Sequence, residues 1–469
     1  MMQVDFRRRK GRGVFEVGIE ENILAILDDA QEAQYSHDNS LAFLEAVRAT
    51  SVAADDGIPP TIKLVAAVFR IFRTGKSLEL IITSSQLLNE LEQKFPRVFV
   101  DEGALELSSG SQPRLIVDEQ AWSPFALNLD SDRVTSNESP ACPIDTLGFY
   151  LLIQELAGAV NDSNVQLQDI RYLRSMLLFQ YLVNVIEVEF LARNRIYEET
   201  MQWTILREST LNILLNSRRV NYKSLVKDCL SIICGLHKIH ASSNDFLEDS
   251  AAKSSKDSQI SLAFASLEVE VEACVAVQKL MITITKLDEL KKQADLKGFT
   301  TRADGVRTPL VEIVVNELTY DNEILSPVLQ VLDHPRWKLE LVLQYFAKYI
   351  TRPAVRTRRG TEPEEDATFY GTLRSFTNIS SAKSVIKKIG SEALQLLLAH
   401  GFLAQISLPR KCSKSEALLY SILEVSLLEI CREMISAFNN LRKAYSHLEI
   451  LPIAKEALFV ASTILSTKS

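Results

Sequence analysis

Two cysteines and two histidines near the middle of the chain are residue types that bind zinc. Cys229, Cys234, His237 and His240 follow one another closely, and zinc requires such groups to converge tetrahedrally on one point. The stretch 222–240, however, has the periodicity of a single helix, in which residues five positions apart diverge by about 140°. We interpret the cysteines as core thiols and the histidines as surface residues, and we predict no metal site.

A second candidate is Gly75-Lys76-Ser77, which matches the last three residues of a phosphate-binding loop. Such a loop also needs a glycine five residues before its second glycine, and a strand that precedes it. Arg70 occupies that position, and residues 68–72 have a helical pattern. We therefore interpret Gly75 as a glycine that ends a helix.

Searches for catalytic motifs favour a protein without catalysis. The chain contains neither a Gly-x-Ser-x-Gly nucleophile elbow nor a His-Glu-x-x-His zinc motif. Its carboxylates recur at spacings of three and four residues, which is typical of solvated helix faces. We predict that the protein is not an enzyme and takes no cofactor, metal or small-molecule substrate.

A basic segment with interleaved aromatic residues is the strongest candidate for binding. Between Arg336 and Arg359 the chain carries seven Lys or Arg residues against one acidic residue. Such a segment can contact phosphates and stack on bases, or it can bind an acidic protein. The alternative is a solvated helix face followed by an Arg-rich loop, which the acidic residues in 362–366 neutralise. The candidate contacts are Arg336, Trp337, Lys338, Lys348, Arg352, Arg356, Arg358 and Arg359, and Tyr345 and Tyr349 lie among them.

The N-terminus is also basic. Residues 1–18 have no hydrophobic period, and we predict that they are disordered. The basic residues of this segment are typical of a nuclear localisation signal, and they are Arg7, Arg8, Arg9, Lys10 and Arg12. The segment lacks the apolar core of a signal peptide, and no stretch of the chain has the roughly 18 uncharged apolar residues of a membrane span. From the residues alone we predict a protein of the cytoplasm or nucleus without membrane contact.

Helices are expected to carry nearly all of these residues. The 469 residues include only 16 Gly and 14 Pro, and Leu, Ile, Ala, Glu and Lys dominate, which favours helices. About fifteen helical patterns follow one another, and such helices stack most simply as antiparallel pairs. No fixed repeat period is present. We predict an all-α fold, a degenerate armadillo- or HEAT-like array with one small β-hairpin near 97–118.

A polar stretch divides the predicted array. Residues 241–257 are rich in Ser, Asp and Lys, which favours a flexible linker. We predict an N-terminal helical repeat region over 19–240 and a C-terminal one over 258–469. The net charge of −8 argues against wholesale coating of nucleic acid.

Several idiosyncratic stretches match one known family in order, from about residue 40 to about residue 460. They are Phe43–Ala49, Gly57–Thr61, Ala121–Phe125, Tyr197–Met201, Asp304–Pro309, Trp337–Glu340, Val342–Tyr345, Val355–Arg359, Lys387–Gly390 and Glu449–Pro452. Through them the sequence resembles the plant negative regulators of systemic acquired resistance, a family of nuclear repressors of inducible immunity genes.

The resemblance implies a role that the residues alone do not. It implies an armadillo-type subunit of the SMC-five/six (structural maintenance of chromosomes) recombination-repair complex, which acts beside another non-SMC element. It also implies repression of pathogenesis-related genes, with DNA-damage control and homologous recombination at its root. We therefore expect a non-catalytic nuclear scaffold whose partners are a non-SMC element and SMC complex proteins. The alternative is a direct DNA-binding transcriptional repressor that uses the basic segment 336–359 on DNA or chromatin.

Overall fold

The protein is described by a computed structural model in which two compact units follow each other, Met1–Arg307 (unit 1) and Thr308–Ser469 (unit 2). The residues that the structure describes are 17–28, 33–53, 57–101, 113–127, 142–161, 169–250, 257–350, 368–376, 378–408, 417–445 and 447–467.

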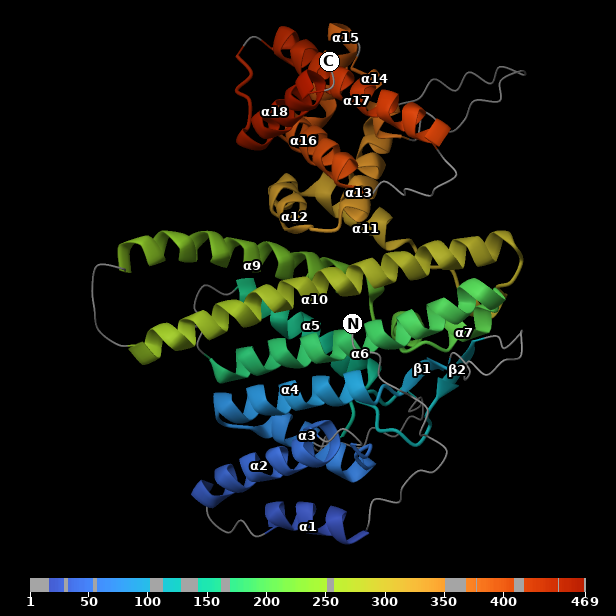
Figure 1. Cartoon of the computed structure of the whole chain (residues 1–469). Helices are drawn as coiled ribbons and strands as arrows, with labels where there is room; N and C mark the ends of the chain where they lie inside the picture. Colours follow the sequence, from blue (N-terminus) through green and yellow to red (C-terminus); the bar gives the residue numbers. More distant parts are fainter. Residues whose placement is uncertain are drawn as a thin grey trace. The chain divides into compact units, whose positions relative to one another are not determined.

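Unit 1 is a stack of helices with one small hairpin, so the all-α prediction is confirmed (Figure 1). The long helix α6 packs against α4 on one side and α10 on the other, and α9 packs against α5 and α10. The helices are α1 (Val17–Asp28), α2 (Ala33–Val47), α3 (Ile62–Thr74), α4 (Leu78–Lys94), α5 (Thr146–Asn161), α6 (Ile170–Thr200), α7 (Trp203–Arg207), α8 (Thr210–Asn216), α9 (Tyr222–Ser250) and α10 (Asp257–Leu296).

The hairpin lies where the sequence predicts it. Strands β1 (Val98–Asp101) and β2 (Arg114–Val117) pair antiparallel, with Val98 opposite Val117 and Asp101 opposite Arg114. Both strands contact α6. The hairpin therefore covers part of the central helix α6.

Helix α6 forms the core of unit 1. Its length and mean hydropathy would allow it to cross a membrane, but 56% of its apolar window is buried inside the protein. Its buried side chains include Phe179, Leu182, Ile186 and Phe190. A helix that is apolar around most of its circumference must be covered on all sides, and α6 is such a core helix.

Helix boundaries in unit 1 follow from capping residues. Ser77 accepts a hydrogen bond from the Leu80 amide at 3.2 Å and begins α4. The Gly75 amide donates to Ile71 at 2.7 Å and ends α3, as we interpreted it. A Cβ atom at Gly75 would lie 2.9 Å from the Ile71 carbonyl oxygen, so the close turn favours glycine. The sequence Gly75-Lys76-Ser77 is thus the boundary between two helices.

Unit 2 is built around α16, which packs against α12, α13, α14, α15, α17 and α18. Nearly every residue from Ala393 to Phe402 is buried. Gly401 lies so close to α14 that a Cβ atom there would be 2.5 Å from the Phe369 ring. The helices are α11 (Leu310–Tyr320), α12 (Leu325–Val331), α13 (Pro335–Tyr349), α14 (Phe369–Arg374), α15 (Ile379–Ile389), α16 (Ser391–Ser407), α17 (Ala417–Ala444) and α18 (Pro452–Thr467).

The structure divides the chain at a different place from the sequence prediction. We predicted a linker at 241–257, but α9 continues to Ser250 and α10 begins at Asp257. Both helices belong to unit 1, and the division falls between Arg307 and Thr308. The polar composition of 241–257 did not mark the boundary between the two units, because α10, which follows this stretch, packs on α6 within unit 1. Of the predicted disordered segment 1–18, residues 1–16 lie outside the described residues, and α1 begins at Val17.

The packing of α14 on α16 gives the first prediction. Gly401→Ala should lower the free energy of unfolding by about 1–3 kcal/mol, because the added methyl group overlaps Phe369. Urea unfolding followed by circular dichroism measures the change. Gly158→Ala is the matched control, because it adds a methyl group where no atom lies within 4 Å. It should raise stability by about 1 kcal/mol through helix propensity. Equal effects from the two substitutions would contradict this packing.

Candidate interaction surfaces

The N-terminal part of the predicted basic segment is largely inside the fold. His334 accepts a hydrogen bond from the Trp337 amide at 3.3 Å and begins α13, with Pro335 at its first turn. The Trp337 side chain is only 4% exposed, so it cannot stack on a base. Lys338 is partly buried, and this burial lowers its pKa. Of the three candidates Arg336, Trp337 and Lys338, only Arg336 is exposed.

The C-terminal part of the segment lies at the other end of α13. Lys348 is twelve positions beyond Arg336, which is about 18 Å along a helix axis. Its Nζ donates hydrogen bonds to Asn316 Oδ1 at 2.5 Å and to Thr319 Oγ1 at 3.0 Å. Tyr345 is buried and packs against the Tyr349 ring.

The predicted single basic and aromatic surface is therefore wrong for the part of it that the structure describes. Helical periodicity turns Trp337 and Tyr345 into the core, and the length of α13 separates Arg336 from Lys348. The remaining candidates lie outside the described residues, and they are Arg352, Arg356, Arg358 and Arg359. The predicted localisation signal also lies outside them, with Arg7, Arg8, Arg9, Lys10 and Arg12.

The most developed polar cluster centres on Asp304. Its carboxylate accepts hydrogen bonds from Arg207 at 2.6 and 2.7 Å, from Trp203 Nε1 at 2.9 Å and from the Thr301 amide at 2.7 Å. Burial alone would raise the pKa of Asp304, but these hydrogen bonds outweigh it and hold the pKa well below its usual range. The carboxylate is thus a fixed anion that fastens the short helix Arg302–Asp304 to α7.

Two further cations secure the chain on either side of this carboxylate. Lys291 donates from Nζ to the carbonyl oxygens of Asp304 and Gly305, both at 2.7 Å. Arg307 donates to Asp288 at 2.5 Å, and its guanidinium lies 5.0 Å from the centre of the Tyr222 ring. These bonds fix the last residues of unit 1. The sequence did not predict this network, because Trp203 and Arg207 lie 101 and 97 positions away from Asp304 along the chain.

Two carboxylates, the buried Glu189 and the half-buried Glu92, lie between α4 and α6. Glu189 accepts hydrogen bonds from Arg193 Nε at 2.8 Å and from the Thr210 amide at 3.3 Å. Burial, with help from Glu189, raises the pKa of Glu92 to about 7. Arg97 opposes this shift. The cavity between them has a volume of about 10 Å³, which is room for one water molecule and for no substrate.

The cysteine and histidine stretch lies on α9, and its two cysteines lie in the core of the protein. Cys229 and Cys234 are buried free thiols. Burial, with Asp228 nearby, raises the pKa of Cys229 to about 12, which disfavours the thiolate that zinc binds. Within the described ranges no three His, Cys, Asp or Glu side chains are placed to hold a metal ion. The side chain of His240 lies outside those residues.

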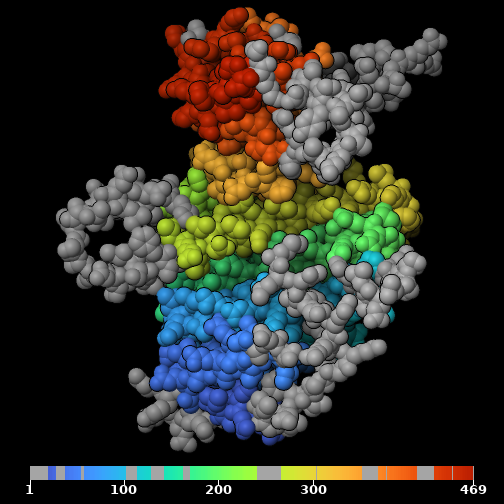
Figure 2. Space-filling model, viewed as in Figure 1, coloured from blue at the N-terminus to red at the C-terminus, as the bar shows by residue number. Residues whose placement is uncertain are grey.

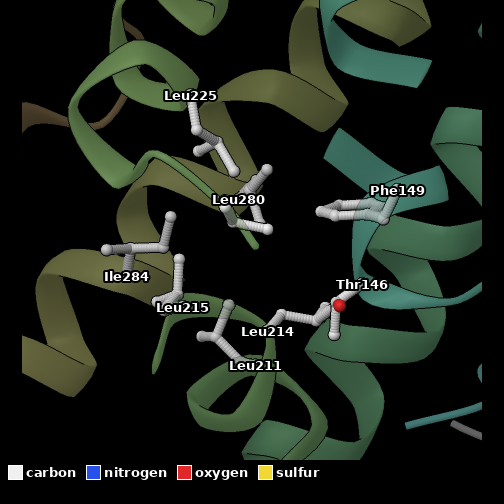
Figure 3. Close-up of a pocket in the computed structure, with 9 residues that line it drawn as sticks. Thr146, Phe149, Leu211, Leu214, Leu215, Leu225, Leu280 and Ile284 are labelled. Carbon is white, nitrogen blue, oxygen red and sulfur yellow. The ribbon is translucent and has the colours of Figure 1, made fainter. Parts of the chain in front are cut away.

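A second cavity, also of about 10 Å³, lies where α5, α8, α9 and α10 meet (Figure 3). Figure 3 shows leucine, isoleucine and phenylalanine side chains that point toward one another, with Thr146 at the edge. On the face in Figure 2, the coloured side chains of α4, α6 and α10 meet without an open cleft. These two cavities are small gaps in the packing of the core. The residues that line the second cavity are Thr146, Phe149, Leu211, Leu214, Leu215, Val220, Leu225, Leu280 and Ile284.

These features define an all-α protein of stacked helices. Two family models match the chain, the SNI1 middle domain over residues 97–334 and the SNI1 C-terminal domain over residues 350–469. The chain is also 42% identical over 455 residues to the negative regulator of systemic acquired resistance SNI1 of Arabidopsis thaliana, which covers 96% of this chain and 95% of that protein. The chain belongs to the SNI1 family, and the resemblance read from its short stretches is confirmed. No solved structure matches it.

The carboxylate pair gives the second prediction. A carboxyl group whose folded pKa is raised contributes stability that is present below its unfolded pKa of about 4.5 and is lost as the pH rises through about 7. Glu92→Gln has no carboxyl group to ionise at this position, so the variant does not lose this stability as the pH rises. The stability of the variant relative to the original protein should therefore rise by about 2–3 kcal/mol between pH 5 and pH 8. Urea unfolding at both pH values measures it. Glu199→Gln, at an exposed carboxylate, should change the free energy of unfolding equally at both pH values. The same result for Glu92→Gln would contradict the burial of Glu92.

The Asp304 cluster gives the third prediction. Asp304→Asn places an amide donor against Arg207 and Trp203, and we expect the free energy of unfolding to fall by about 2–4 kcal/mol. Adding Arg207→Met should cost less than the sum of the two single changes, because the two residues share one interaction. Glu208→Gln, beside Arg207 and exposed, is the control and should change stability by less than about 0.5 kcal/mol. Strict additivity would show that the pair is not coupled.

Proposed function

We propose that the protein is a negative regulator of systemic acquired resistance. The observation that carries this proposal is the 42% identity to the SNI1 relative over 96% of the chain. That relative's name states the regulatory role, and the match extends over nearly the whole of both chains. A match of this length supports transfer of the role of the whole protein rather than that of one domain.

In this proposal the protein works as a non-catalytic nuclear scaffold. It binds a non-SMC element and SMC complex proteins, and it represses pathogenesis-related genes by supporting the DNA-damage response and homologous recombination. Two observations support a binding role. The described cavities are too small for a substrate, and large apolar side chains at Leu296, Phe299 and Val306 remain exposed within one segment of unit 1. Exposed apolar side chains that gather on a surface are typical of protein contacts.

The regulatory role is tested by complementation, which is the fourth prediction. Expression of the full chain in an Arabidopsis plant that lacks the SNI1 relative should return pathogenesis-related transcripts to their low uninduced level. Asp304→Asn should restore less, in proportion to its lower protein level, because it weakens unit 1. Transcripts that stay high despite normal levels of nuclear protein would contradict the proposal.

A separate purification experiment in the same plants tests the scaffold role. A tagged chain purified from nuclei should recover SMC proteins and a non-SMC element in constant proportion. Leu296→Asp with Val306→Asp should reduce this recovery, because these are the most exposed large apolar side chains described in unit 1. Leu147→Asp with Leu151→Asp on α5, also exposed, is the matched control. Recovery of the tagged chain only as a free monomer would contradict the scaffold role.

A further inference from the structure

The helix α15 separates its residues into a buried apolar face and an exposed basic face. Asn378 accepts a hydrogen bond from the Ser381 amide at 2.8 Å and begins the helix. The buried residues are Ala382, Val385, Ile386 and Ile389, which recur at helical spacing. The exposed residues on the other side are Ser380, Lys383, Ser384, Lys387 and Lys388.

The charge of this face is of one sign. Residues 368–391 contain four Lys or Arg residues and no Asp or Glu. Lys383 and Lys387 are four positions apart, where like charges weaken a helix. The helix dipole favours Lys387 and Lys388 in the last turn, but it does not account for Lys383. Neither Lys383 nor Lys387 forms an ion pair with any described residue.

A hydrogen bond joins this face to the end of α13. Lys388 Nζ donates to the Tyr349 carbonyl oxygen at 3.1 Å, across 39 positions of the chain. The bond places the C-terminal end of α15 beside the last turn of α13, where Lys348 is exposed. Lys348 belongs to the predicted basic segment, so the fold brings the exposed end of that segment to a second basic element. We call Ser380, Lys383, Ser384 and Lys387 the lysine face. Lys388 and Lys348 lie at its C-terminal end, and their Nζ atoms bond to the Tyr349 carbonyl oxygen and to Asn316 and Thr319.

We propose that the lysine face binds the phosphate backbone of duplex DNA without reading its bases. Lysines with short hydroxyl side chains between them are the groups that contact phosphates. The same residue types, Lys and Ser, are depleted at the core of protein–protein interfaces, which favour aromatic residues and Arg. The exposed middle of α15 has no aromatic or large apolar anchor. Lysine is also a point charge, whereas base recognition uses the planar fork of arginine.

This inference is independent of the proposed scaffold role. The net charge of −8 does not oppose it, because exposed charges farther away than about 10 Å are screened at ordinary ionic strength. The face can therefore hold duplex DNA locally while other surfaces bind proteins.

The test, which is the fifth prediction, measures binding of the full chain to a short fluorescent duplex of random sequence by anisotropy. With about two phosphates neutralised by Lys383 and Lys387, log K should fall against log salt with a slope of roughly −2 between about 50 and 200 mM. Lys383→Gln with Lys387→Gln should make the slope shallower by about 2, since each phosphate contact contributes about 0.9. Binding near 50 mM salt should weaken by more than about 10-fold.

Two control variants separate local from total charge. Lys292→Gln with Lys297→Gln removes the same charge from exposed positions of unit 1 and should keep the slope. Lys383→Arg with Lys387→Arg should also keep it, because both positive charges remain. Circular dichroism melting should be the same for all variants. Recovery of nuclear partners by the Lys383→Gln, Lys387→Gln variant should be unchanged, so the scaffold role is judged separately.

Three results would overturn the proposal. The first is no duplex binding at low salt. The second is equal weakening by the α15 pair and the unit 1 pair, which would mean that only net charge matters. The third is tight binding of polyglutamate, with no binding of the duplex, which would assign the face to an acidic protein.

Discussion

Helix α6 is buried on nearly every side, and the layered form of unit 1 depends on this burial. A helix of 31 residues with apolar side chains around its circumference leaves most of that area in water unless other elements cover it. The covering elements are α4, α5, α10 and the hairpin. The packing of α9 on α5 and α10 repeats the same step one layer further out.

The burial of α6 also carries ionisable groups into the core. Glu189 and Arg193 of α6 are both buried and bonded to each other. Glu92 of α4 and Glu270 of α10 approach α6 from its two sides, and burial raises the pKa of each to about 7. Burial raises the pKa of Tyr172 on α6, and the nearby Glu270 raises it further. Two of these groups also fix neighbouring short helices on α6, because Glu189 accepts from the Thr210 amide of α8 and Arg193 donates to the Ile205 carbonyl oxygen of α7.

Much of this fold could be predicted from the sequence, because the signals are local. Helical periodicity, the Gly75 and Ser77 boundary and the hairpin near 97–118 all depend on residues close together along the chain. The division at Arg307 could not be predicted, because it reflects which distant helices pack together. The bonds from Asp304 to Trp203 and Arg207 join positions 101 and 97 residues apart, and no sequence window relates them. Polar composition at 241–257 indicated a linker, whereas packing decides where a compact unit ends.

The basic segment illustrates the same limit at the surface. Along the chain, Arg336 and Lys348 belong to one run, and Lys387 and Lys388 belong to another. In space α13 separates the first two by its length, and the bond from Lys388 to Tyr349 brings the second run to the end of the first. Charge acts over distance in space and not along the sequence, and salt limits that distance to about 10 Å. A charged surface in a stack of helices is therefore defined by which helix ends meet, so a run of basic residues indicates a partner only after the fold has placed it.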